Sequence, residues 1–362
     1  MKILKVLALS SLCIFASLWL AFQFYERSLS EPIQLENEGM LLEVKKGESM
    51  RSVIERLQGL GVLRNYWVAR MYVRLEGLGS QLKVGEFQLA NHMDMRALFA
   101  MLISNNQVLY RISLIEGSTF QEARQKIAQT ENLETTLKNQ SNSELLALLN
   151  ERVRIKLIDK YPAVLLNDLL ENFSHLEGLI YPDTYFYHKG DSDFDLLARA
   201  HQRLVMVLLN EWQAKASSLP FNTPYEALIL ASVIEKETGK PSERSEISGV
   251  FVRRLKKGMR LQTDPTVIYG LGDRYKGNIT RKHLREMTVY NTYRINGLPL
   301  TPIALAGREA IHAALHPRAG TSLYFVAKGD GSHIFSETLA QHNRAVRDYQ
   351  LRRKKDYRSS FK

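Results

Sequence analysis

The sequence predicts an α+β protein with a single N-terminal transmembrane helix, a small α+β module and a larger mixed α/β domain. Three observations support this prediction. An uncharged apolar run opens the chain, a strand–turn–helix pattern occurs three times between residues 41 and 129, and amphipathic segments separated by Gly- and Pro-containing loops follow. A chain of 362 residues has room for two or three domains.

The apolar run at the N-terminus predicts a membrane anchor. Val6–Phe22 contains no charge and is just long enough for a bilayer core of ~30 Å. Lys2 and Lys5 precede the run and Glu26 follows it, so the positive-inside rule predicts a cytoplasmic N-terminus. A cleaved signal peptide is the alternative, but bulky residues rather than a small-residue cleavage site end the run. We therefore favour a retained anchor.

The next elements follow from hydrophobic periodicity. Residues 41–63, 82–104 and 110–129 each read as a short strand, a turn and an amphipathic helix. We expect the first two to form the module and the third to lead into the next domain. Ser192–Trp212 predicts a long amphipathic helix, and residues 323–335 predict a hairpin joined by KGDGS.

A buried helix that ends in two glutamates is the candidate reactive element. Pro224 follows a capping threonine and starts the helix, and the apolar run Leu228–Ile234 carries it to Glu235 and Glu237. Burial among apolar side chains and the negative end of the helix dipole both disfavour an ionised carboxylate. An acid that stays protonated near neutral pH can protonate the leaving oxygen of a glycosidic bond.

The helical period distinguishes the two glutamates. The residues three, four and seven positions before Glu237 are bulky and apolar, whereas those before Glu235 are smaller and more polar. Because successive positions turn by about 100°, the two carboxyls point roughly opposite ways. The period favours Glu237 as the inward-facing acid and leaves Glu235 solvated or paired with Arg or Lys. A charged helix end without chemistry is the alternative.

A polar trio lies a short way further along the chain. Gln262, Thr263 and Asp264 stand together before Pro265, which can start another helix with Asp264 as its cap. The trio can be only a cap and a turn, or it can hydrogen-bond a sugar beside a buried glutamate.

Several sequence motifs follow one another along the chain in a specific order. They are ASVIEKETG…SERSEISGVFVRRLKKGMRLQTDPTVIYGLG around Glu237, LEGLIYPDTYFY (176–187), NTYRINGLPLTPIALAG (291–307), HPRAGTSLYFVAKGDGSHIFS (316–336) and HN (342–343). With these motifs the chain resembles, from about Gly85 onward, the YceG-like endolytic murein transglycosylases of the MltG type. One loop departs from the family pattern, because the usual GLPPGPIxNPG is GLPLTPIALAG here.

The resemblance implies a lyase that acts on peptidoglycan with Glu237 as its catalytic acid. The expected reaction cleaves the β-1,4 bond between MurNAc and GlcNAc within nascent glycan strands. It leaves 1,6-anhydroMurNAc ends and terminates strand elongation. The family implies a lysozyme-like helical active-site region and a LysM-like glycan-binding module. A spacer that lifts the larger domain off the membrane is the alternative to that module.

Substrate contacts are expected where aromatic rings, carboxylates and hydroxyls cluster, since sugars offer apolar faces and hydroxyl edges. The candidate substrate-binding residues are Glu177, Tyr185, Gln262, Thr263, Asp264, Asn291, Thr292 and Tyr293. A water-using muramidase with Asp264 or Glu177 as a second carboxylate remains an alternative. A non-catalytic glycan-binding scaffold of the cell-wall machinery is another.

The remaining expectations concern boundaries and partners. The predicted segments are 1–5 (cytoplasmic end), 6–25 (transmembrane helix), 26–40 (linker), 41–108 (LysM-like module), 109–350 (YceG-like catalytic domain) and 351–362 (basic tail). We expect a single-pass protein of the cell inner membrane with a periplasmic catalytic domain. Its expected partners are glycan strands, the membrane, peptidoglycan synthases and the elongation or division machinery.

Composition excludes other classes. The net charge is +11, but no zinc spacing, RNP sequence or basic recognition helix accompanies it, so no nucleic-acid partner is expected. Scattered basic residues instead suit anionic lipid or the acidic stem peptides of the wall polymer. Nine histidines show no HExxH pattern, so no metal is expected, and no cofactor is needed. The single cysteine, Cys13, lies in the apolar run and allows no intrachain disulfide.

Overall fold

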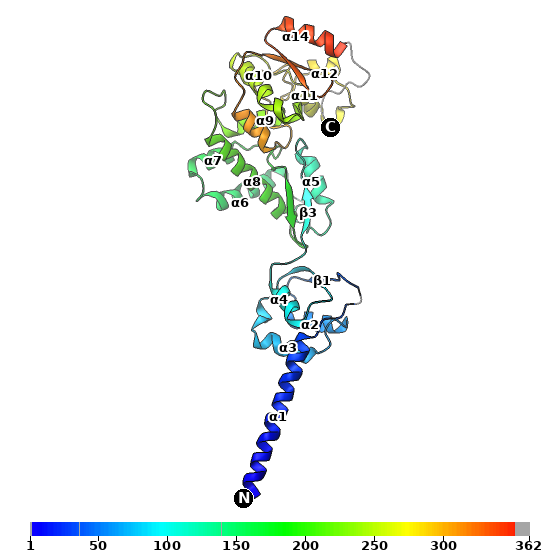
Figure 1. Cartoon of the computed structure of the whole chain (residues 1–362). Coiled ribbons are helices and arrows are strands. Elements are labelled where there is room, and N and C mark those ends of the chain that lie inside the picture. The colour runs from blue at the N-terminus through cyan, green and yellow to red at the C-terminus, as the bar shows by residue number, and fades with distance from the viewer. Residues whose placement is uncertain (1, 36, 139, 352–362) are drawn as a thin grey trace. The chain divides into compact units, whose positions relative to one another are not determined.

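The chain forms two compact units, each combining helices with short strands (Figure 1). The structure, a computed structural model, describes residues 2–35, 37–138 and 140–351. Unit 1 runs to Tyr110 and also contains Phe186–Asp191, and unit 2 contains Arg111–Tyr185 and the chain from Ser192 onward. The prediction of an α+β protein is therefore confirmed. Nothing in the sequence predicted the short return of the chain to unit 1.

Unit 1 begins with α1 (Lys2–Ser30), which is long and apolar enough from Lys5 onward to cross a membrane. α1 continues to Ser30, so the first residues of the predicted linker 26–40 are helical. Leu29 and Ile33 then enter the hydrophobic core of the unit.

The rest of unit 1 packs around an antiparallel pair of strands. Its elements are β1 (Leu41–Val44), α2 (Met50–Gly59), α3 (Tyr66–Leu75), η1 (Leu78–Ser80), β2 (Gly85–Gln88) and α4 (Met95–Ile103). Leu41 pairs with Gln88 and Val44 with Gly85. Phe87 and Phe99 are fully buried at the centre of the core. The first two predicted strand–turn–helix patterns are confirmed.

A second sheet pairs β3 (Tyr110–Ser113) with β4 (Thr184–Tyr187), and the boundary between the units falls within each strand. The third predicted pattern continues into α5 (Phe120–Ala128), which belongs to unit 2 as expected. Thr119 and Glu122 form a capping box that satisfies the first backbone donors of α5.

Unit 2 is predominantly helical. Its remaining helices are α6 (Asn142–Leu157), α7 (Ala163–Asn172), α8 (Asp193–Gln213), α9 (Pro224–Glu237), η2 (Pro241–Glu243), α10 (Arg244–Lys256), α11 (Asp264–Leu271), η3 (Gly272–Arg274), α12 (Arg281–Arg285), α13 (Arg308–Leu315), α14 (Leu339–Val346) and η4 (Arg347–Leu351). The predicted amphipathic helix is α8, capped by Ser192.

Helix α9 lies in the centre of unit 2 and packs against α7, α8, α10, α11 and α13. Every side chain from Ala227 to Ile234 is buried. Thr223 caps its N-terminus by accepting from the Glu226 backbone, and Pro224 occupies the first turn, as predicted. A helix that is apolar all round is buried on all sides. The packing around α9 therefore fixes the position of the two glutamates in its last turn.

The predicted hairpin is also confirmed. β5 (Tyr324–Ala327) pairs antiparallel with β6 (His333–Ser336), with Ala327 opposite His333. The hairpin packs against α10 and α14, so it forms a wall beside the C-terminal part of unit 2. The basic tail 351–362 lies outside the described residues, apart from Leu351 at the end of η4.

Candidate active site

A cleft of about 800 Å³ opens in unit 2 at the end of α9. Glu237 lies at one side of it, together with residues 261–264, which connect α10 to α11. The other walls come from the loop 275–279, Tyr293, the β5–β6 hairpin and α14. The lining residues span 236–350, so separate segments of the C-terminal part of unit 2 meet around the last residue of the buried helix.

Glu237 has the properties of a general acid. Its Oε1 accepts a hydrogen bond from the Thr263 hydroxyl, and the residue remains partly accessible from the cleft. Burial raises the pKa of Glu237 to about 7, and the negative charge of Asp264 acts in the same direction. The Thr263 hydrogen bond and the Arg254 charge oppose this by stabilising the carboxylate. Near neutral pH the group is therefore divided between its acid and base forms.

Glu235 points away from the cleft, as the helical period predicted. Its carboxylate accepts from Arg244 at 3.1 Å and from the Gly307 backbone N–H at 3.0 Å. Its side chain is only 6% exposed. Arg244 also pairs with Glu309, so Glu235 belongs to a buried ion-pair network that ties α9 to α10 and α13. Of the two expected alternatives, solvated or paired with Arg or Lys, the structure shows the pairing with Arg.

The structure brings the predicted polar trio into the cleft with Glu237. Gln262 has a φ of 51°, a left-handed conformation that is uncommon outside glycine and marks a local constraint. The backbone N–H of Thr263 donates to the Thr292 hydroxyl at 3.0 Å, which orients the Thr263 side chain. The strained backbone of Gln262 and the buried hydrogen bond of the Thr263 N–H therefore fix the position of the Thr263 hydroxyl, which donates to Glu237.

Asp264 does not cap α11, contrary to our expectation. The helix begins at Asp264 itself, with Thr263 in the capping position and no side-chain cap bond. The carboxylate instead accepts from the Tyr293 hydroxyl at 2.7 Å, and both residues line the cleft. Burial and the adjacent Asp264 charge raise the pKa of Tyr293. This Tyr293 stays neutral at physiological pH and remains a hydrogen-bond donor.

Two predicted site residues, Glu177 and Tyr185, do not line the cleft. The carboxyl of Glu177 is buried and accepts from the Phe120 backbone at 2.9 Å and from the Tyr269 hydroxyl at 3.1 Å. Tyr185 is buried on β4 and donates to the Tyr181 carbonyl at 2.8 Å. The structure thus places both side chains in internal hydrogen bonds.

Asn291 and Thr292 are also buried behind the cleft rather than in its lining. The Asn291 amide donates to the carbonyls of residues 283, 284 and 286 and so fixes the loop after α12. Thr292 bonds the backbone of Thr263 and shares a 2.8 Å hydrogen bond with the Thr266 hydroxyl. Asn291 and Thr292 therefore hold in place the backbone that carries the cleft residues Thr263 and Tyr293.

Arg254, Tyr324 and His342 are among the cleft residues that were not predicted as site residues. The Arg254 guanidinium lies 5.0 Å from the Tyr324 ring centroid, and the His342 ring stacks on Tyr324 at 5.3 Å. Arg254 donates to the carbonyls of Leu323 and Leu261. The His342 Nδ1 is buried and has no hydrogen-bond partner among the described residues. The HN motif already marked His342, whereas Arg254 was concealed in a basic run.

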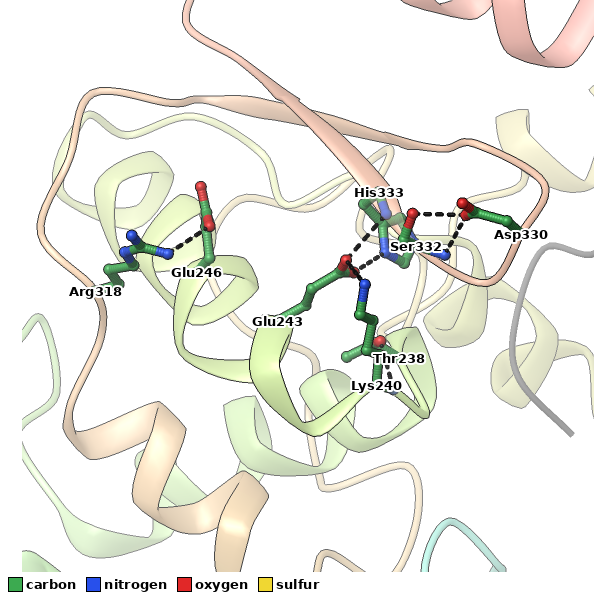
Figure 2. Close-up of polar contacts among 8 residues, drawn as sticks. All are labelled: Thr238, Lys240, Glu243, Glu246, Arg318, Asp330, Ser332 and His333. Atoms are coloured by element: carbon green, nitrogen blue, oxygen red, sulfur yellow. Dashed lines mark hydrogen bonds and ion pairs between the residues drawn. The ribbon is translucent and has the colours of Figure 1, made fainter.

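A second polar cluster holds the hairpin wall in place (Figure 2). The Glu243 carboxylate contacts His333 Nδ1 at 2.7 Å and Lys240 Nζ at 3.3 Å. At the turn of the hairpin, Asp330 accepts from the backbone and the hydroxyl of Ser332. Because His333 also lines the cleft, the cluster joins the segment after α9 to the opposite wall.

The loop that departs from the family pattern braces α9. The backbone N–H of Ile303 donates to the Ser232 hydroxyl at 3.0 Å. Thr301 is buried and shares a 3.0 Å hydrogen bond with the Tyr290 hydroxyl. None of residues 300–306 lines the cleft, so the departure changes packing behind the helix rather than the cleft surface.

Among the described residues, one group has donor atoms close enough for a metal ion: Glu211, His312 and His316. The two imidazole rings are stacked at 4.1 Å, so their in-plane lone pairs do not converge on one point. Glu211 also accepts from Arg308 at 2.9 Å. We interpret the group as an ion-pair network away from the cleft, and the expectation of no metal stays a prediction.

The fold and site define a protein with one inward-facing, near-neutral carboxyl at the end of a buried helix, facing a polar and aromatic cleft. The YceG-like family model matches residues 42–348. The chain therefore belongs to the YceG-like family.

Known proteins extend this comparison. An endolytic murein transglycosylase of Bacillus subtilis is 31% identical over 330 residues, covering 90% of this chain and 89% of that protein. One of Streptococcus pneumoniae is 24% identical over 84% of this chain, which spans 57% of the length of the pneumococcal protein. The crystal structure of a YceG-like protein from Listeria monocytogenes aligns with a TM-score of 0.53 and 30% identity, covering 85% of this chain and 98% of that one.

Proposed function

We propose that this chain is an endolytic murein transglycosylase, a lyase. It cleaves the β-1,4 bond between MurNAc and GlcNAc within nascent glycan strands and leaves 1,6-anhydroMurNAc ends, which terminates elongation. The observation that carries the proposal is Glu237, an acid with a pKa of about 7 in a cleft. The names of the Bacillus and Streptococcus relatives support the substrate and the reaction.

The mechanism needs one residue in two protonation states. Protonated Glu237 donates its proton to the bridging glycosidic oxygen as the bond to C1 breaks. The resulting carboxylate then removes the proton from the muramyl 6-hydroxyl, which attacks C1 and closes the anhydro ring. Because the nucleophile belongs to the substrate, proximity replaces both a second carboxylate and a bound water. A pKa near the working pH suits both steps.

We assign the neighbouring cleft residues to substrate binding. Gln262, Asp264 and Tyr293 present an amide, a carboxylate and a phenol beside Glu237. Thr263 positions Glu237 through its hydroxyl. Glu177, Tyr185, Asn291 and Thr292 support the fold around the cleft in this proposal and do not touch the glycan.

A water-using muramidase is the competing reaction. It needs a second carboxylate about 5–9.5 Å from the acid, and Asp264 is the other acidic residue that lines the cleft among the described residues. Its carboxylate already accepts from Tyr293, and its charge raises the pKa of Glu237. We assign Asp264 to binding and to tuning of Glu237.

Product analysis in heavy-oxygen water tests the proposal. The purified protein is incubated with uncrosslinked glycan strands in H₂¹⁸O, and the new ends are analysed by mass spectrometry. Intramolecular closure gives anhydro ends without the label, one water lighter than reducing ends. Labelled reducing MurNAc ends would replace the transglycosylase with the muramidase. No cleavage by the folded protein would leave a glycan-binding scaffold.

We further propose that α1 anchors the protein in the inner membrane in a single pass, with a cytoplasmic N-terminus and unit 2 in the periplasm. Lys2 and Lys5 before the apolar run support this orientation. The strand–helix–helix–strand order of residues 41–88, with antiparallel strands, supports a LysM-like glycan-binding module there. We propose peptidoglycan synthases and the elongation or division machinery as its protein partners.

A further inference from the structure

Helix α3 in unit 1 carries an apolar stripe that nothing in the described chain covers. Trp67, Met71 and Leu75 are 75%, 45% and 68% exposed. They recur every four residues, so at about 100° per residue they form one continuous stripe. The packed face of the same helix is a different one, formed by Val68 and Val73. The helix therefore has two apolar faces, and the core of unit 1 covers one of them.

The position of α3 identifies the surface beside this stripe. Asn65, just before α3, donates to the Ser28 hydroxyl at 3.1 Å, and Arg64 pairs with Glu31 at the same distance. Ser28 lies in the last turn of α1, six residues after the apolar run ends at Phe22. Figure 1 shows α3 at the end of unit 1 from which α1 emerges.

When α1 spans a bilayer, the surface of that bilayer lies at the level of α3. The nineteen residues from Val6 to Phe24 extend about 28 Å as a helix, roughly the thickness of the hydrocarbon core. The next turn, where α3 packs, then lies in the headgroup region. Tryptophan with neighbouring arginines is the composition that favours this layer, since its ring is apolar and its indole N–H is polar.

The basic residues beside the stripe are also suited to contact the bilayer surface. The Arg70 guanidinium lies 5.8 Å from the Trp67 ring centroid, and Arg74 is exposed one turn further on. Both can bury their aliphatic stems along the stripe while their charges reach lipid phosphates. Glu76 at the end of α3 is the opposing charge nearby in sequence, so the basic residues predominate.

We infer that α3 lies on the periplasmic surface of the bilayer, with Trp67, Met71 and Leu75 inserted among anionic lipid headgroups. Unit 1 would then be fixed to the membrane at two places, by a spanning helix and by an interfacial one. This inference rests on the proposed anchoring of α1. It adds a membrane-binding face to unit 1.

Nitroxide accessibility in the full-length protein tests the inference. Cys13→Ser removes the single cysteine, and Met71→Cys or Leu75→Cys then places a spin label on the stripe. Gln88→Cys, at the exposed last position of β2, is the aqueous control, and Phe15→Cys, in α1, is the membrane control. The proteins are reconstituted in vesicles of phosphatidylcholine and phosphatidylglycerol. Collision rates with oxygen and with a water-soluble nickel complex are compared.

We expect the oxygen-to-nickel ratio at Met71 and Leu75 to exceed that at Gln88 several-fold and to approach the ratio at Phe15. A ratio at the stripe equal to that at Gln88, with Phe15 in lipid, refutes the inference and leaves the anchor intact. A water-like ratio at Phe15 refutes both proposals. Spin–spin broadening between copies at Met71 refutes the inference in favour of a second copy of this chain.

Discussion

The hydrogen bond from Thr263 to Glu237 gives the clearest quantitative prediction. It stabilises the ionised carboxylate, so it lowers a pKa that burial raises. Thr263→Val removes the hydroxyl at nearly constant volume, and Thr263→Ser keeps it. Hydrogen bonds to charged groups contribute about 1.5–3 kcal/mol, and ~1.4 kcal/mol corresponds to one pKa unit. We therefore expect Thr263→Val to raise the pKa of Glu237 by about one unit or more.

The sign of the effect on activity follows from the role of Glu237 as proton donor. Activity that needs the protonated acid falls as pH rises through the pKa, near 7 in the native protein. In Thr263→Val this alkaline limb of kcat/KM should move to about pH 8 or above, with a lower maximum because the carboxyl is less well oriented. Thr263→Ser should keep the native limb.

The assay is the rate of anhydro-end formation on purified glycan strands between pH 5 and 9, with thermal unfolding measured in parallel. An unchanged or acid-shifted limb in folded Thr263→Val would refute the hydrogen bond as a stabiliser of the carboxylate. Asp264→Asn provides the opposite test. It removes the negative charge that raises the pKa of Glu237, so its limb should move to lower pH.

Two further substitutions separate the glutamates, and one of them also tests how stability depends on pH. Glu237→Gln should fold and lose cleavage by at least two orders of magnitude, because an amide cannot donate the proton; residual turnover near the native rate would exclude Glu237 as the acid. Glu235→Gln should keep cleavage in the folded fraction but lower the free energy of unfolding by about 1–3 kcal/mol, since it weakens a buried pair with Arg244; loss of activity at unchanged stability would reverse the assignment. Glu237→Gln should also stabilise the fold by up to ~3 kcal/mol above pH 7 and by little near pH 4, because the raised native pKa penalises the ionised form; a stability difference that is flat with pH in chemical unfolding would contradict the buried acid.

The parts of the site that could be predicted from the sequence depend on local geometry. The helical rotation between Glu235 and Glu237 points their side chains in different directions. The apolar residues one and two turns before Glu237 predict that Glu237 faces inward. The structure agrees, with Glu235 bound to Arg244 and Gly307. The hairpin and the strand–turn–helix patterns were also accessible, because turn residues and periodicity lie within a few positions of each other.

The parts that could not be predicted depend on long-range packing. Asn291 and Thr292 are polar and stand in a loop, which suggested substrate binding, yet carbonyls and hydroxyls elsewhere in the fold use their hydrogen bonds. Arg254 stands in the run RRLKK, where the pattern suggests a solvated helix end. Its guanidinium instead donates hydrogen bonds to backbone carbonyls of two other segments. The sequence alone does not show which distant residues form hydrogen bonds with these side chains.

The same reasoning explains why an acid at the end of a buried helix suits this chemistry. A carboxyl deeper in α9 would be protonated at all relevant pH values, and one on the surface would be ionised. At the last residue of α9, burial raises the pKa of Glu237 and the Thr263 hydroxyl lowers it, while the Asp264 charge raises it further and the Arg254 charge lowers it. The resulting pKa lies where a single group can give a proton and take one back. The surrounding structure, from the strained Gln262 to the buried Thr292, holds those few charges and dipoles in place.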